Sequence, residues 1–244
     1  MLEFLAGAGS PVTVEAIKSG TGIPGSSAYR ILRSLVDRGW ATSTTDGKYS
    51  PGPRFVGLAG ALRLDHWIAA VAPPKMQKLA EATDETVLLT VITGHFALCV
   101  ARVEGSQLVR ATLEPGALLP LHSGASSLVL LAFAPKELID SVLSRPLAPY
   151  TKKGQVDPRR LRKRLGGIRD AGFVVTTGEV DAGLTAIAVN VPLGPESAVF
   201  QMVGPIGLSV VGPSERLRND VQAQVLVELR NCAREIAQVV IAMF

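Results

Sequence analysis

Hydroxyl side chains and arginines gather on one side of an amphipathic segment near the N-terminus. Five apolar residues within 26–38 follow the i, i+3, i+4, i+7, i+8 spacing of one helical face: Ala28, Ile31, Leu32, Leu35 and Val36. The opposite face then carries Ser26, Ser27, Arg30 and Arg33, with Tyr29 to one side. Hydroxyls and backbone amides at a helix start can bind phosphates, and arginine can bond guanine in the major groove. The pattern predicts a DNA-recognition helix capped by Ser26 or Ser27.

The segments around this helix follow the order of a winged helix-turn-helix. An apolar helix ends at Gly7, and Thr13 can cap a second short helix over residues 14–19. Residues 40–44 and 48–50 are predicted to form a hairpin, because the intervening Thr45-Asp46-Gly47 places the favoured turn pair Asp-Gly at its turn. Lys48 on this wing and Arg54 just beyond it could hold the flanking DNA backbone. The candidate DNA-binding residues are Thr13, Ser26, Ser27, Tyr29, Arg30, Arg33, Lys48 and Arg54.

The charge of this N-terminal region is modest for a DNA-binding domain. Residues 1–65 hold seven Lys or Arg against five Asp or Glu, a net charge of +2. Dimerisation would double the contacts, so we expect a homodimer or larger assembly on palindromic double-stranded operator DNA. Two alternatives stay open: a winged domain used only for protein contacts, and a small-molecule-processing enzyme with a fused winged domain. The absence of a GxSxG nucleophile motif argues against the second.

Beyond the wing, the sequence predicts a linker helix and then a second domain. We place the winged helix-turn-helix at residues 1–53, the linker helix at 54–72 and the second domain at 73–244. In that domain the apolar pattern predicts strands at 87–93, 97–103, 108–113, 173–177, 185–192 and 199–211. Helices are expected at 75–83, 126–133, 136–143, after an Asp157 cap with Pro158 at the first position, and at 215–244. The expected fold class is α+β, with a mostly antiparallel sheet flanked by helices.

Composition narrows the class of protein further. Hydrophobic residues make up 47% and mean hydropathy is +0.30, yet apolar runs such as 128–134 are far shorter than the about 18–20 residues of a membrane span. No signal peptide is visible, and two cysteines without a CxxC pair fit a reducing cytoplasm. Three histidines without ligand spacing argue against a metal site, and we expect no cofactor. Nine Lys or Arg between residues 145 and 169 are interpreted as a solvated basic helix rather than a DNA or partner contact.

Several stretches in order along nearly the whole chain resemble the IclR family of bacterial regulators. They include Thr21–Pro24, Ser26–Leu32, Leu35–Trp40, Tyr49–Arg54, Pro120–His122, Ile168–Phe173, Glu179 with Gly183, Ala186–Ala188 and Leu208–Pro213. The lead-in is short, with the first helix truncated at Met1. The resemblance implies a GAF-like effector-binding domain, homodimers that pair into homotetramers, and small organic acids or aromatic compounds as effectors. We therefore predict a cytoplasmic transcription regulator, a repressor of a catabolic operon, coupled to its effector through residues 54–65.

The resemblance also implies where the effector binds. In this family the loop after Pro-Leu-His supplies backbone amides to the effector's carboxylate, which here points to Gly124, Ala125 and Ser126. Amides at a helix start suit an anion because unpaired N–H donors and the positive end of the helix dipole coincide. The family often has Gly-Lys where this chain has Ser127-Leu128, so a cation is missing from the loop.

Four strand positions complete the implied pocket: Thr176, Ala186, Ser209 and Val211. Family members can present an acid, a cysteine and a second serine where this chain has Thr176, Ala186 and Val211. All three differences lower the polarity of the pocket, so we expect an aromatic or aliphatic acid rather than a very small oxoacid. The alternative is that these three residues only face the core of the domain.

Overall fold

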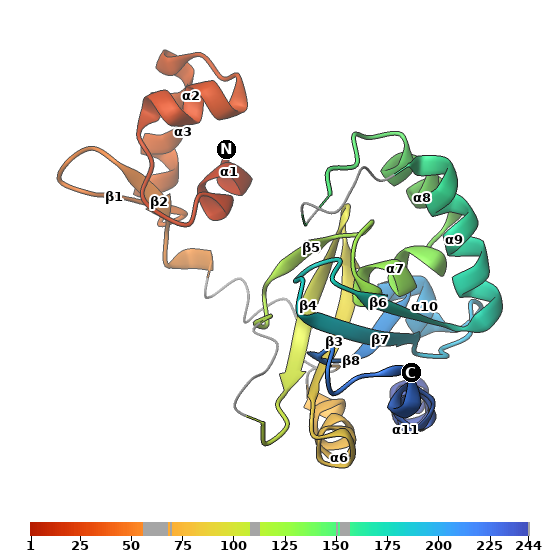
Figure 1. Cartoon of the computed structure of the whole chain (residues 1–244). Helices are drawn as coiled ribbons and strands as arrows, with labels where there is room; N and C mark the ends of the chain where they lie inside the picture. Colours follow the sequence, from red (N-terminus) through yellow and green to blue (C-terminus); the bar gives the residue numbers. More distant parts are fainter. Residues whose placement is uncertain (56–67, 69, 108–112, 150, 152–156, 244) are drawn as a thin grey trace. The chain divides into compact units, whose positions relative to one another are not determined.

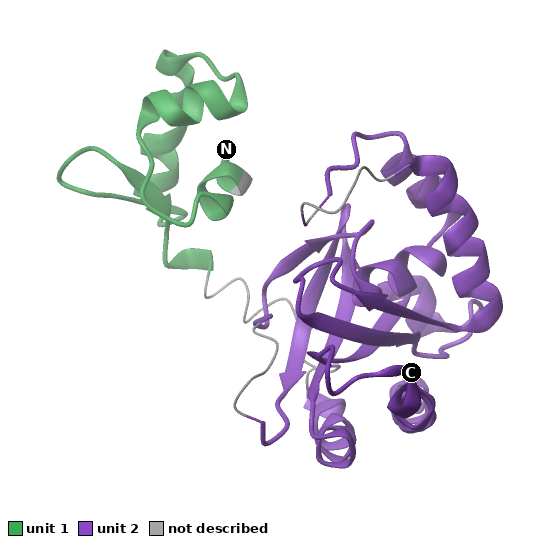
Figure 2. Ribbon diagram, in the orientation of Figure 1, with its two compact units in different colours: residues 1–66 green, residues 67–244 purple. Residues whose placement is uncertain are grey.

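Two compact units divide the chain, Met1–His66 and Trp67–Phe244 (Figure 2). The computed structural model describes residues 1–55, 68, 70–107, 113–149, 151 and 157–243. Most of the predicted linker helix, and residues 108–112 of a predicted strand, lie outside the described residues.

The first unit has the predicted order of helices followed by a hairpin (Figure 1). Helices α1 (Leu2–Gly7), α2 (Val14–Thr21) and α3 (Gly25–Asp37) precede strands β1 (Ala41–Ser43) and β2 (Tyr49–Pro51), which pair antiparallel. One buried side chain from each of four elements forms the core: Leu5, Ile17, Leu32 and Ala41. The Asp46-Gly47 turn is confirmed, with Gly47 at a φ of 74°.

The start of α3 differs from the prediction. Neither Ser26 nor Ser27 caps the helix, because the cap position is Pro24 and no side chain bonds the first turn. Pro24 has extended backbone angles, and its carbonyl accepts the amide of Ala28 at 2.8 Å, so the helix is already closed at Gly25. Both serines consequently lie within the first turn. Ile31, which we assigned to the packed face, is 39% exposed because Ala28 and Leu32 occupy the centre of that face.

A six-stranded sheet in the order β5-β4-β3-β8-β7-β6 organises the second unit. Its strands are β3 (Thr86–Thr93), β4 (Phe96–Val103), β5 (Leu118–Pro120), β6 (Phe173–Thr177), β7 (Leu184–Asn190) and β8 (Ile206–Pro213). Each pair of neighbours is antiparallel, which confirms the predicted α+β architecture.

Helices cover both faces of this sheet (Figure 1). Helices α6 (Pro73–Thr83) and α11 (Asn219–Ile241) pack on one face, and α7 (Ala125–Ala132), α8 (Lys136–Leu143) and α9 (Pro158–Ala171) on the other. The alternation of side chains along a strand separates the two layers. In β8, Leu208 and Val210 join the core under α6 and α11, whereas Ser209 and Val211 face away from it.

The predicted strand over 199–211 is wrong in its first part. Residues Ala198–Val203 form helix α10, because the Ser197 hydroxyl accepts the amide of Phe200 at 3.1 Å and so caps the helix. Gly204, at a φ of 73°, ends it, and β8 begins only at Ile206. The short strand β5 was not predicted, since three residues carry too little pattern to identify a strand. Its place is decided by pairing with β4.

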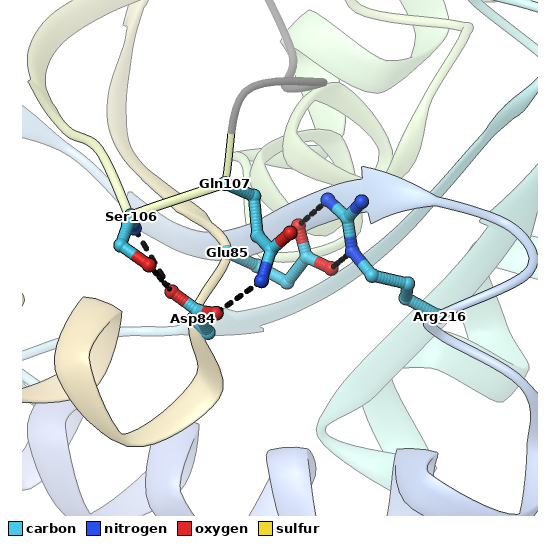
Figure 3. A network of polar contacts seen from close by, with 5 residues as sticks. All are labelled: Asp84, Glu85, Ser106, Gln107 and Arg216. Atoms are coloured by element: carbon cyan, nitrogen blue, oxygen red, sulfur yellow. Dashed lines mark hydrogen bonds and ion pairs between the residues drawn. The ribbon is translucent and has the colours of Figure 1, made fainter.

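A polar network fastens the junction of α6 and β3 (Figure 3). Arg216 donates two hydrogen bonds to the Glu85 carboxylate, at 2.5 and 2.8 Å, and the Glu85 side chain is only 3% exposed. Asp84, at a φ of 57°, accepts from the amide and hydroxyl of Ser106 and from Gln107. These hydrogen bonds, of which the one from Gln107 has the largest effect, hold the pKa of the Asp84 carboxyl below its ordinary value.

Candidate functional site

The outward face of α3 presents the polar residues that the spacing predicted. Ser26, Arg30 and Arg33 are exposed, Ser27 is half-buried, and the Tyr29 ring is 57% exposed. Within the described residues, no hydrogen bond or ion pair engages Arg30 or Arg33. The two guanidinium groups are therefore available to an external acceptor.

The other three candidate DNA-binding residues already have partners inside the first unit. The Thr13 hydroxyl caps α2 by accepting the amide of Ala16 at 3.3 Å. On the wing, Lys48 forms an ion pair of 2.8 Å with Asp46. The Arg54 guanidinium lies 5.2 Å from the centre of the Trp40 ring, in a cation–π contact. These interactions fix the shape of the unit around α3.

A cavity of about 230 Å³ lies within the second unit, between the start of α7 and one face of the sheet. Six of the seven predicted effector-binding residues line it: Gly124, Ala125, Ser126, Thr176, Ala186 and Val211. The seventh, Ser209, is not among the lining residues. Its hydroxyl shares a 2.7 Å hydrogen bond with the hydroxyl of Ser126, which lines the cavity. The structure thus brings the whole predicted set together.

Strand register explains why these residues converge. Thr176 pairs with Ala186, and Ala186 pairs with Val211, so three neighbouring strands place one residue each in a single row. Ser209 lies two residues before Val211 on the same face, opposite Leu88 of β3. Adjacent rows on one face of a sheet form a continuous wall.

The start of α7 closes the other side of the cavity. Gly124 has a φ of 82° and a ψ of 152°, a conformation open almost only to glycine. Gly207 of β8 lets the helix approach the sheet, because a Cβ there would lie 3.3 Å from the Ser126 carbonyl oxygen and 2.7 Å from the Thr90 hydroxyl. All eight residues of α7 are buried.

Side chains from β6 and the turn after it already bond the amides at this helix start. The amide of Gly124 donates to a carboxylate oxygen of Glu179 at 3.2 Å, and that of Ala125 donates to the Thr176 hydroxyl at 3.2 Å. The second oxygen of Glu179 pairs with Arg164 of α9 at 2.7 Å. The predicted anion-binding loop is therefore occupied in part by groups of the protein itself.

Sequence reasoning missed about half of the lining. Five apolar residues complete the walls, namely Leu88, Leu113, Leu119, Val180 and Leu184, and two acids, Glu179 and Asp181, lie among the lining residues. Leu88 sits in the almost uniformly buried run of β3, so the sequence did not reveal which face it takes. Glu179 belonged to the family pattern, but nothing in the sequence linked it to a loop 55 residues away.

Other candidate chemistry is sparse in the part of the chain that the structure describes. No group of three or more His, Cys, Asp or Glu side chains there could hold a metal ion. The described helices include none with the length and apolar character needed to cross a membrane. Burial raises the pKa of Cys99 to about 11 and that of Cys232 to about 12, so both remain thiols at neutral pH. His122 contacts the Ala148 carbonyl oxygen at 2.7 Å.

Family models match both units of the chain. The IclR helix-turn-helix domain matches residues 1–44, and "Bacterial transcriptional regulator IclR C-terminal" matches residues 63–238. The chain is 28% identical to the HTH-type transcriptional regulator KipR of Bacillus subtilis, over 93% of this chain and 89% of KipR. It is 29% identical to the HTH-type transcriptional repressor AllR of Escherichia coli, over 97% of this chain and 86% of AllR.

A solved structure is also similar to the chain. It is an IclR homologue from Microbacterium hydrocarbonoxydans complexed with 4-hydroxybenzoate, with a TM-score of 0.74 and 29% identity over 99% of this chain and 96% of that one. KipR and AllR are named as regulators of transcription, which decides against the alternative of an enzyme with a fused winged domain.

Proposed function

Because the chain belongs to the IclR family of bacterial transcriptional regulators, we propose that it is a repressor of a catabolic operon. Its α3 binds operator DNA, and a small organic acid or aromatic compound in the cavity of the second unit controls that binding. The observation that carries the proposal is the convergence of the loop at Gly124 and three strands on one mainly apolar cavity.

For the DNA contact, the exposed face of α3 supports direct reading of bases. Arg30 and Arg33 are assigned to base edges, and Ser26, Ser27 and Tyr29 to the backbone beside them. Thr13, Lys48 and Arg54 are assigned to flanking phosphates. Arg54 can bind a phosphate while it remains in contact with the Trp40 ring, because a guanidinium over a ring still has N–H donors at its edge.

For the effector, the size and lining of the cavity support a small, mainly apolar ligand. The volume of about 230 Å³ lies below the about 300–1,000 Å³ of sites for drug-sized ligands. Leucines, valines and alanines supply most of the lining, which suits an aromatic ring or a short aliphatic chain. The similar protein bound to 4-hydroxybenzoate makes a substituted benzene the first ligand class to test.

Assembly and coupling complete the proposal. We place the DNA-binding domain at residues 1–53, the linker at 54–72 and the effector domain at 73–244, in a cytoplasmic homodimer or homotetramer on a palindromic operator. The effector shifts the population between subunit arrangements that space the recognition helices differently, through the linker.

Operator binding is tested by a gel shift with the chain's own upstream intergenic DNA. Arg30→Ala is expected to weaken the specific shift by about 10- to 100-fold, the value of one bidentate base contact, without loss of circular dichroism. Arg160→Ala is the matched control, because that side chain is 91% exposed on α9. Unchanged binding by Arg30→Ala, or equal loss in both variants, contradicts the proposed role of α3.

Effector class is tested by titration calorimetry with glyoxylate and 4-hydroxybenzoate. We expect binding of the aromatic ligand and much weaker binding of glyoxylate, because the apolar walls contribute only when a ligand covers them. Clear preference for glyoxylate contradicts the apolar-effector proposal.

A further inference from the structure

We propose that Glu179 is a tethered competitor for the effector's acidic group, so that the cavity selects an uncharged aromatic ligand over the corresponding carboxylate. This inference rests on the proposed function, because it concerns the ligand of the same cavity. It assigns to Glu179 a role in specificity beyond the lining of the site.

Two contacts hold the Glu179 carboxylate at the helix start. One oxygen accepts the amide of Gly124 at 3.2 Å, and the other pairs with Arg164 at 2.7 Å. The side chain is 30% exposed, so the carboxylate is positioned from two sides and not buried out of reach. A ligand carboxylate can use the Gly124 amide only by displacing Glu179.

The charges of the lining penalise such a ligand. Both ionisable side chains among the described lining residues are acids, Glu179 and Asp181. Arg164 stands behind Glu179 and is not itself part of the lining. An incoming carboxylate therefore meets like charge, and an incoming neutral group does not.

An uncharged amide, by contrast, matches the groups already in place. Thr176 accepts the amide of Ala125 through its oxygen and keeps its O–H to donate. A ligand carboxamide can accept from this hydroxyl with its oxygen and donate to the Glu179 carboxylate with its nitrogen. Donation to a carboxylate is a charge-assisted bond, stronger than a neutral one.

Calorimetry with two probes of the same shape tests the inference. The probes are 4-hydroxybenzoate and 4-hydroxybenzamide, titrated into the full-length wild type and Glu179→Gln. The wild type is expected to bind the amide about tenfold more tightly, the usual difference between a charged and a neutral hydrogen-bond partner. In Glu179→Gln the ratio of the two affinities is expected to shift by about tenfold or more toward the carboxylate.

Asp181→Asn is the matched control for loss of a negative charge. Asp181 is exposed, and its carboxylate accepts the amide of Gly183 at 2.9 Å within its own turn. Its removal is expected to shift the ratio by less than about threefold, as for other exposed charges. An equal shift in both acid variants would assign the selectivity to net charge and overturn the specific role of Glu179.

An NMR measurement follows the contact directly. Labelling serine carbonyls with ¹³C and glycine amides with ¹⁵N selects the two Ser-Gly pairs of the chain, Ser19-Gly20 and Ser123-Gly124. Glu179→Gln should move the Gly124 signal and leave Gly20 in place, as should saturation of the wild type with 4-hydroxybenzoate. A Gly124 signal that stays in place overturns the inference.

Different results would contradict the role of Glu179 and the proposed effector class. If both probes bind and their affinity ratio is the same in Glu179→Gln as in the wild type, only the competitor role of Glu179 is wrong. If neither probe binds either protein, the aromatic effector class is wrong, and the inference falls with it.

Discussion

Helices α3 and α7 begin with similar residues and present them to opposite environments. Helix α3 starts Gly25-Ser26-Ser27-Ala28, and α7 follows Gly124 with Ala125-Ser126-Ser127. At α3 no side chain caps the first turn and Ser26 is exposed. At α7 both serines are buried, and Glu179 and Thr176 bond the amides of Gly124 and Ala125.

The difference shows that a helix start with a glycine and two adjacent serines has no fixed role. Each helix start leaves amide donors without partners in the helix itself, and the surroundings decide what accepts from them. In the first unit solvent or a phosphate can do so. In the second unit, Thr176 of β6 and Glu179 of the turn after it, more than fifty positions later in the chain, accept from these amides and line a cavity.

The largest expected effect comes from replacing the glycine at each of these two helix starts, Gly25 and Gly124, by alanine. Gly124→Ala should destabilise the second unit by about 2–4 kcal/mol, because its backbone conformation excludes a Cβ that would also lie 2.7 Å from Val180. Gly25→Ala should be neutral or stabilise by up to about 1 kcal/mol, since its Cβ would meet only Lys18 at 3.9 Å. Urea denaturation gives the free energies of unfolding, and amide hydrogen exchange localises the change. Equal effects at the two glycines would show that the helix starts are alike.

A smaller effect is expected from removing one hydroxyl at each helix. Ser126→Ala should cost about 1–3 kcal/mol of stability, because it leaves the fully buried Ser209 hydroxyl without its partner. Ser26→Ala should stay within about 0.5 kcal/mol, as for other exposed positions without partners. The double variant of Ser126 and Ser209 to alanine should cost less than the sum of the single variants. Strict additivity would argue that the two hydroxyls do not interact.

The smallest effect concerns the wing beside α3. Lys48 and Thr44 lower the pKa of Asp46 from 3.8 to about 2, so Asp46 stays charged and Lys48 stays paired at neutral pH. Because the pKa is lowered in the folded state, this pairing is complete above pH 4 and is lost as the pH falls toward 2. Asp46→Asn should release Lys48 and tighten operator binding about threefold in a gel shift at low salt. Asp220→Asn, in the second unit, is the control, and weaker binding by Asp46→Asn would contradict a phosphate contact by Lys48.

Much of the fold could be predicted from local patterns. The Asp157 cap, for example, is confirmed by its 2.9 Å bond to the Arg159 amide, and β6 has the predicted bounds. These features depend on residues close in sequence, where capping chemistry and hydrophobic period act directly. The set that lines the cavity came instead from family likeness, and the strand register supplies its physical reason.

What could not be predicted depends on contacts between distant segments. Residues 199–203 have a strand-like composition, yet the Ser197 cap and Gly204 make them helical. Glu179 belonged to the family pattern, but only the fold shows that its carboxylate accepts from the Gly124 amide. At Pro24 the prediction failed for a local reason, because a proline ahead of two serines takes the cap position and both serines fall inside α3.

The alternation of side chains in the sheet of the second unit has an evolutionary consequence. Ala186 and Val211 line the cavity, whereas their neighbours Ile187 and Val210 belong to the core under α6 and α11. A substitution at one of the first pair can reshape the cavity while the opposite layer keeps its packing. Such a sheet can therefore change its ligand through successive single substitutions, each of which leaves a folded protein.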